Sequence, residues 1–211
     1  MSKLNKSLVI EGVASTQDKD SQGEILSLAG ADISHLKEAK GFANSDHSGR
    51  FEHLVGRILD AKIINKASEC DTQYQVSQWQ KLQKPFLWNK IELFDGNGHK
   101  EADAIASVYR HYQDKGEEAP IKLSVEGKVV SRDSKNKHVL KQTVIKGVAI
   151  TIQPANKSTH TEVVGMMKSM GTESLMKSES RSFIEIKESD AERLLNLVLT
   201  ANAMLKSLLP K

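Results

Sequence analysis

The chain has a single cysteine, Cys70, among its 211 residues. One thiol cannot close a disulfide within the chain, and it cannot supply a zinc site built on several cysteines. No neighbour of Cys70 in the sequence indicates an activated thiol. We therefore interpret Cys70 as an ordinary small side chain in a protein made in a reducing compartment.

Aromatic residues are scarce as well, at 5% of the chain, which argues against a stacking platform for single-stranded nucleic acid. No apolar run approaches the roughly 20 residues that cross a bilayer, and the first residues have no run typical of a signal peptide. The net charge of +3 comes from basic residues that are interspersed with acidic ones. We expect a soluble protein with no membrane partner and no specific nucleic-acid partner.

The common enzyme motifs are also missing. The sequence has no G-x-S-x-G elbow, no P-loop, no H-E-x-x-H helix and no G-x-G-x-x-G turn after a strand. Two histidines, His47 and His53, lie close together, but their spacing matches no common zinc site. We therefore expect no metal and no cofactor.

What remains is a chain with 38% hydrophobic residues, enough for one domain with an appendage. Residues 41–52 are rich in Gly, Asn, Ser and Asp and are predicted to form a loop, while residues 74–84 fit neither a helix nor a strand clearly. Several strands and few helices predict a β-rich α+β domain over residues 1–157, a closed or curled antiparallel barrel. The expected strands cover residues 8–14, 54–64, 86–94, 121–130 and 139–152, and the expected helices cover residues 33–39 and 100–115.

The last part of the chain differs in character. Residues 158–188 are dominated by Ser, Thr, Lys, Met and Gly without a steady period, which predicts a flexible linker. Residues 189–211 then have apolar side chains at three- and four-residue spacing, which predicts an amphipathic helix. Such a helix is too apolar to stand alone in water, so we expect it to dock on a scaffold partner or on a copy of itself.

One serine raises a question of function. Residues 121–127 read IKLSVEG, and their alternation of apolar and polar side chains predicts a half-buried strand with Ser124 on its polar face. A serine in that position is usually only solvated. Its interpretation depends on the segments that accompany it in the chain.

Four segments in order resemble a known family. They are IEGVAST followed by DKDSQGEIL, then ANSDHSGRFEHLVGRI, then IKLSVEG, and finally KGVAITIQPANKS with its Pro-Ala-Asn signature. Together they cover roughly residues 8–157. Their order and spacing resemble the head maturation (prohead) proteases of tailed phages, serine proteases related in fold to the herpesvirus assemblins.

The resemblance implies that Ser124 is the nucleophile and His47 the general base. A serine hydroxyl needs a base within hydrogen-bond reach, and a neutral imidazole suits that task near pH 7. His53 is the alternative base. The family often has an acidic residue seven positions before the proline of Pro-Ala-Asn, but this chain has Gly147 there. The site is then a dyad, a triad with a relocated acid, or an inactive relic.

The candidates for a third member are Asp20, Asp46, Glu126 and His138. None of them is singled out by the sequence. His138 is disfavoured, because a hairpin turn within residues 133–136 would place it on the opposite face from Ser124.

The resemblance also implies a setting. Family members cut themselves, the scaffold and capsid-protein arms inside the prohead, in the host cytoplasm. The partners would be capsid and scaffold proteins, with a homodimer as a further candidate, and Glu188 in Ile-Lys-Glu is a candidate self-cleavage site. The first alternative is a non-catalytic capsid assembly or scaffold protein on the same fold. The second is an unrelated small β-rich binding module.

Overall fold

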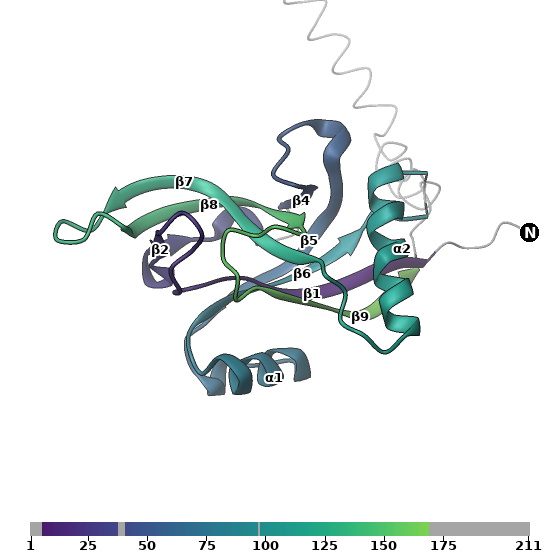
Figure 1. Cartoon of the computed structure of the whole chain (residues 1–211), viewed down its shortest axis with the longest axis horizontal. Coiled ribbons are helices and arrows are strands. Elements are labelled where there is room, and N and C mark those ends of the chain that lie inside the picture. The colour runs from purple at the N-terminus through teal and green to yellow at the C-terminus, as the bar shows by residue number, and fades with distance from the viewer. Residues whose placement is uncertain (1–5, 38–40, 97, 169–211) are drawn as a thin grey trace, which may run out of the picture. The chain divides into compact units, whose positions relative to one another are not determined.

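Nine strands form one mixed sheet in the computed structural model, which describes residues 6–37, 41–96 and 98–168 (Figure 1). The main order is β2-β8-β4-β5-β6-β1-β9, and β3 and β7 also pair with β8. The strands are β1 (Lys6–Thr16), β2 (Ile25–Leu26), β3 (Ala31–Asp32), β4 (Phe42–Ser45), β5 (Leu54–Ile64), β6 (Phe86–Leu93), β7 (Lys122–Arg132), β8 (Val139–Thr151) and β9 (His160–Lys168).

The predicted β-rich α+β class is confirmed, but of the expected closed or curled antiparallel barrel the closed form is wrong. The sheet formed by the described residues does not close. Three short strands, β2, β3 and β4, run parallel to β8, so the sheet is mixed. Among the described strands, β7 pairs only with β8 and β9 pairs only with β1, so the sheet stays open between β7 and β9. The resemblance to the assemblin fold therefore stays an expectation.

Within the described residues, two α-helices accompany the sheet, α1 (Gln73–Leu82) and α2 (Lys100–Asp114). The helix α1 lies in the segment that fitted neither a helix nor a strand, and its start is fixed by a capping box. Thr72 Oγ1 accepts a hydrogen bond from the Gln75 backbone, and the Gln75 side chain accepts one from the Thr72 backbone. The helix α2 ends close to Gly116, whose positive φ of 67° suits a glycine after a helix.

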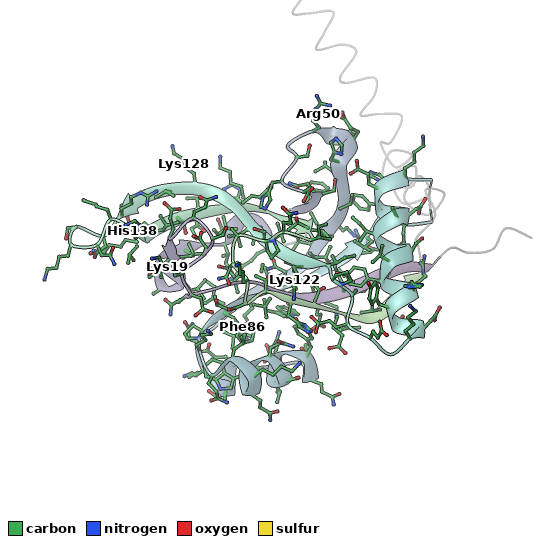
Figure 2. All side chains as sticks on the ribbon, viewed as in Figure 1. Lys19, Arg50, Phe86, Lys122, Lys128 and His138 are labelled. Atoms are coloured by element: carbon green, nitrogen blue, oxygen red, sulfur yellow. The ribbon has the colours of Figure 1, made fainter. Side chains whose placement is uncertain are left out.

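The central strands β1, β5 and β6 bury apolar side chains on both faces. One face belongs to the main core, in which Ile10, Ile58, Ile91 and Leu123 pack with buried residues of α2. The other face forms a smaller cluster beneath α1, with Val13, Ile64, Tyr74, Phe86 and Trp88. This double burial explains why β6 reads as a near-continuous buried run (Figure 2 labels Phe86 near α1).

Several expected strands are confirmed with small changes of boundary, and two segments differ. Phe42–Ser45 forms β4 inside the predicted loop, because its backbone pairs with β5 and β8. Residues 160–168, assigned to the linker, form β9 by pairing with β1, so the sheet continues past the boundary expected at residue 157. Short 3-10 turns also occur, including Ser34–Leu36 where a small helix was expected. The remaining 3-10 turns are η1 (Leu28–Gly30), η3 (Phe51–His53) and η4 (Ala67–Glu69).

The strands β7 and β8 form a long hairpin that extends beyond β2 (Figure 1). No helix in the described part of the chain is long and apolar enough to span a membrane. The rest of the predicted linker, the candidate cleavage site at Glu188 and the predicted helix at 189–211 lie outside the described residues.

Candidate active site

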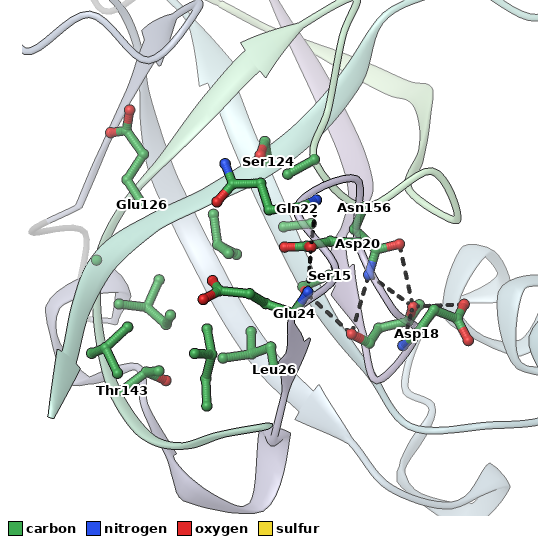
Figure 3. A pocket seen from close by; sticks show the side chains of 18 of the residues that line it. Ser15, Asp18, Asp20, Gln22, Glu24, Leu26, Ser124, Glu126, Thr143 and Asn156 are labelled. Atoms are coloured by element: carbon green, nitrogen blue, oxygen red, sulfur yellow. Dashed lines mark hydrogen bonds between the residues drawn. The ribbon is translucent and has the colours of Figure 1, made fainter. Parts of the chain in front are cut away.

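A cavity of about 480 Å³ lies against the inner parts of β7 and β8. Its polar lining includes Ser124 and His47, the two residues for which the family resemblance implies catalytic roles. Figure 3 shows Ser124 and Glu126 on the β7 side, with Asp20 and Glu24 on the facing turn. The fold therefore brings to one cavity residues from five separate parts of the sequence, which are residues 14–26, His47, and residues 124–129, 140–145 and 155–156.

Ser124 is placed by the pairing of β7 with β8. Its partner across the ladder is Ala149, and only 3% of the serine surface is exposed. Its hydroxyl has no hydrogen-bond partner among the described residues, although it lines the cavity. The buried side-chain polar atoms that lack a partner in the described residues do not include the Ser124 hydroxyl, so this oxygen is open to the cavity. An unpaired hydroxyl open to a cavity is a feature that a reacting group would need.

His47 is carried by a tight turn after β4. The Ser48 backbone N–H donates to the Ser45 carbonyl at 3.1 Å, and the two central residues, Asp46 and His47, have φ of 54° and 61°. Positive φ at both central positions is typical of a type I′ turn and is uncommon for residues other than glycine. The turn is tied to β8, because Thr151 Oγ1 donates to Asp46 Oδ1 at 2.5 Å. This unusual backbone presents the imidazole at the cavity.

Glu126 contacts His47 directly. Its Oε1 lies 3.1 Å from His47 Nδ1, and its Oε2 accepts a hydrogen bond of 2.5 Å from Asn44 Nδ2. An ionised carboxylate only accepts hydrogen bonds, so Nδ1 carries the hydrogen of this contact, and in a neutral imidazole Nε2 then has the lone pair. Of the four candidates for a third member, Glu126 is the one in contact with His47.

The sheet register explains this gathering. Ser124 pairs with Ala149, and Ala149 pairs in turn with Asn44 on the other side of β8. Glu126 follows two residues after Ser124, so both side chains lie on one face about 7 Å apart along the strand. Neighbours on one face can interact across strands, which lets Asn44 reach the carboxylate.

Gly147 has a specific place in this arrangement. It is paired with Glu126 across the hairpin, and a Cβ built on it would lie 3.2 Å from Glu126 Oε2. The missing side chain leaves room for the Glu126 carboxylate to lie over β8 towards Asn44. Where the family pattern has an acid, this chain has Gly147, and the residue paired with Gly147 on β7 is the acid Glu126.

His53 lies elsewhere. It contacts Glu101 of α2, and Glu101 also accepts a hydrogen bond from Ser45 Oγ. The hydrogen bond from Ser45, and then the one from His53, lower the pKa of Glu101 below its ordinary value. His53 lines a second, largely apolar groove between α2 and β8, which Ser124 does not line. The structure does not bring His53 together with the candidate nucleophile.

The remaining candidates have other surroundings. Asp20 lines the cavity, but its Oδ1 accepts hydrogen bonds from the backbones of Gln22 and Glu24 and so shapes the turn. The Asp46 carboxylate is held by Thr151. His138 is exposed near the tip of the hairpin, away from the cavity (Figure 2).

The Pro-Ala-Asn segment forms part of the cavity wall. Asn156 Nδ2 donates to the Thr16 carbonyl at 3.1 Å, and the Ala155 carbonyl accepts from Ser21 N at 2.8 Å. Figure 3 shows these Asn156 bonds beside Asp18. Burial raises the pKa of Asp18, but hydrogen bonds from Lys84 and Ser158 lower it overall. This segment therefore ties the end of β8 to β1 and to the turn that faces Ser124.

Asn44 was missed by the sequence reasoning. It is 6% exposed, and its Oδ1 is buried without a partner while its Nδ2 holds Glu126. The segment around it is rich in turn-forming residues, which pointed to a loop. Only the parallel pairing with β8 identifies Asn44 as a strand residue on the Ser124 face.

No protein-family model, no curated protein and no solved structure matches this chain.

Proposed function

We propose that this protein is a serine endopeptidase with Ser124 as nucleophile, His47 as general base and Glu126 as the acid that orients the base. The observation that carries the proposal is the 3.1 Å contact between Glu126 Oε1 and His47 Nδ1 at a cavity that Ser124 also lines. A nucleophile, a base and an acid that orients the base are what acyl transfer by a serine requires.

The chemistry follows from this arrangement. The Ser124 hydroxyl attacks the peptide carbonyl, and His47 Nε2 takes the hydroxyl proton as the new C–O bond forms. The carboxylate of Glu126 keeps the proton on Nδ1 and stabilises the imidazolium. His47 then gives its proton to the leaving amine as the peptide C–N bond breaks. Water, activated by the same imidazole, hydrolyses the acyl-enzyme and restores the serine.

The substrates are proposed from the resemblance. A head maturation protease would cut scaffold and capsid proteins, and its own chain, during assembly of the prohead. Its partners would be those proteins, inside the prohead in the host cytoplasm. Glu188 stays the candidate site of self-cleavage.

A fluorophosphonate probe tests the catalytic assignment, because it reacts covalently with activated serine hydroxyls. We expect intact-mass analysis to show one added probe on the wild type and none on Ser124→Ala or His47→Ala. Ser131→Ala is the matched control, since Ser131 lies on the same strand and bonds to Gln142. Equal labelling of the wild type and Ser124→Ala would contradict the assignment.

Co-expression with the capsid and scaffold proteins tests the substrates. The wild type should yield shortened capsid or scaffold chains, and Ser124→Ala should leave them at full length. If Ser124 reacts with the probe but the capsid and scaffold proteins stay uncut, the assignment as a serine endopeptidase would stand and the proposed substrates would be wrong.

A non-catalytic assembly protein on the same fold is the second candidate. It is favoured by the Ser124 hydroxyl, which makes no hydrogen bond to His47 in this structure. Catalytic hydrogen bonds often tighten only when substrate binds, so the missing hydrogen bond is compatible with both candidate functions. The two candidates differ in the experiments on Ser124. An assembly protein would support head formation with Ser124→Ala and would leave the probe unreacted.

A further inference from the structure

The outer part of the β7–β8 hairpin is strongly basic. Residues 127–146 contain six basic residues and one acidic residue, a surplus of five positive charges, whereas the whole chain carries +3. The mixture of charges seen over the whole chain therefore does not hold here. The basic residues are Lys128, Arg132, Lys135, Lys137, Lys141 and Lys146.

All six of these side chains are exposed. Arg132 pairs with Glu24, but none of the five lysines has an ion-pair partner within the described ranges. The one acid, Asp133, has a pKa lowered by hydrogen bonds from the Asn136 and Lys135 backbones and then by nearby lysines. Its carboxylate accepts hydrogen bonds from the backbone of the turn, and one acid cannot balance the charge of the six basic residues.

The hairpin also projects from the fold. In Figure 1 its tip reaches past β2, and Figure 2 shows Lys128 on its outer side and His138 near the tip. The strands rise about 3.3 Å per residue, so the basic positions cover about 20 Å. Long, solvated cations spread along a narrow two-stranded arm can follow a chain of negative charges.

We propose that this basic hairpin binds the phosphate backbone of nucleic acid without regard to sequence. Two features favour nucleic acid over an acidic protein. Lysine is depleted at protein interfaces, which are built around aromatic and arginine anchors, and the hairpin has five lysines, no aromatic residue and an arginine that is already paired. Phosphates, by contrast, need only accessible cations. Without aromatic residues the hairpin cannot stack bases, so the contact is electrostatic.

The test uses the full chain and a short fluorescein-labelled DNA duplex, followed by fluorescence anisotropy at several salt concentrations. Three to five phosphate contacts would give a slope of log K against log salt between about −2.7 and −4.5. The variant Lys135→Gln/Lys137→Gln/Lys141→Gln should bind at least about tenfold more weakly near 50 mM salt and reduce the slope by about 2.7.

A matched control removes the same charge elsewhere. Lys81→Gln/Lys100→Gln/Lys115→Gln changes three exposed lysines on or beside the helices, and we expect it to bind DNA like the wild type. Circular dichroism checks the fold of both variants. If the hairpin variant does not fold, Lys128→Gln/Lys146→Gln replaces it with an expected slope change of about 1.8.

Three results would overturn the proposal. The wild type could fail to bind the duplex at low salt, or the control could lose as much affinity as the hairpin variant. Poly-glutamate of equal charge could also displace the duplex at a lower concentration than unlabelled DNA does, which would assign the hairpin to an acidic protein. None of these measurements depends on proteolysis, so they stand apart from the test of Ser124.

Discussion

Glu126 and Gly147 are paired across the β7–β8 hairpin, and the glutamate carboxylate occupies the side of the ladder that the glycine leaves open. The carboxylate bridges His47 and Asn44 from that position. Gly147 stands where the family pattern has an acid, and this glycine is compatible with a catalytic acid supplied by the neighbouring strand β7.

This relationship makes Glu126 the first residue to change. Glu126→Gln keeps the size of the side chain and an oxygen for Asn44, but removes the negative charge that stabilises the imidazolium. We expect the rate of peptide cleavage or probe labelling to fall about 10²- to 10⁴-fold. The melting temperature should change little.

Glu52→Gln is the control for that experiment, because Glu52 lies on the loop of His47 but faces solvent beside Arg50. It should retain the wild-type rate. Equal rates for Glu126→Gln and the wild type would mean that the site works as a Ser124–His47 dyad.

Gly147→Ala tests the space over β8. The added Cβ would approach Glu126 Oε2, the end of a flexible side chain, and its next neighbour is the Phe42 carbonyl at 3.6 Å. We expect the free energy of unfolding to stay within about 1 kcal/mol of the wild type, while the rate falls because the carboxylate must move. Chemical denaturation and probe labelling measure the two effects. A wild-type rate would show that the placement of the carboxylate does not limit the reaction.

Glu101 is predicted to position the His47 loop from both ends, since it contacts Ser45 before the loop and His53 after it. Glu101→Gln should lower the protection of the Ser48 amide against hydrogen exchange and reduce the rate of probe labelling. Asp114→Asn removes a carboxylate from the exposed end of the same helix and should change neither.

The pH dependence of this anchor has a definite sign. The pKa of Glu101 is lowered in the folded protein, so its stabilising effect is present above the ordinary glutamate range and is lost as the pH falls through the folded value. Protection factors of Ser48, corrected for intrinsic exchange, should therefore fall in acid for the wild type. These protection factors should vary less with pH in Glu101→Gln. If they show the same pH dependence in the wild type and in Glu101→Gln, Glu101 does not hold the His47 loop in place.

His160 gives a prediction of stability. Burial lowers its pKa below the ordinary value of 6.5, while Glu118, 3.0 Å from Nε2, acts in the opposite direction. The unfolded chain therefore binds this proton more readily, and stability falls as the pH is lowered from about 7 towards the folded pKa. His160→Gln should flatten this part of the curve in denaturation experiments. His138→Gln, at an exposed site, should leave the curve unchanged.

The local patterns of the sequence determined most of the long elements. Alternation predicted β7 with Ser124 on the polar side, and helical spacing predicted α2 with its end before Gly116. These features depend on neighbours within a few residues, so they can be predicted from the sequence alone. The roles of Ser124 and His47 were predicted from the resemblance in the order of four segments, and they stay a prediction.

The tertiary structure decided which acid meets His47 and where Asn44 lies. Both depend on the parallel pairing of β4 with β8 and on the register of β7 against β8. Together these pairings bring Glu126 to Asn44 and His47, which lie 82 and 79 positions away in the sequence. A shift of one residue in that register would turn Glu126 to the other face. The strand β9 was not predicted from the sequence either, since it forms by pairing with the backbone groups at the edge of β1. Contacts between distant strands set such features, and no local pattern encodes them.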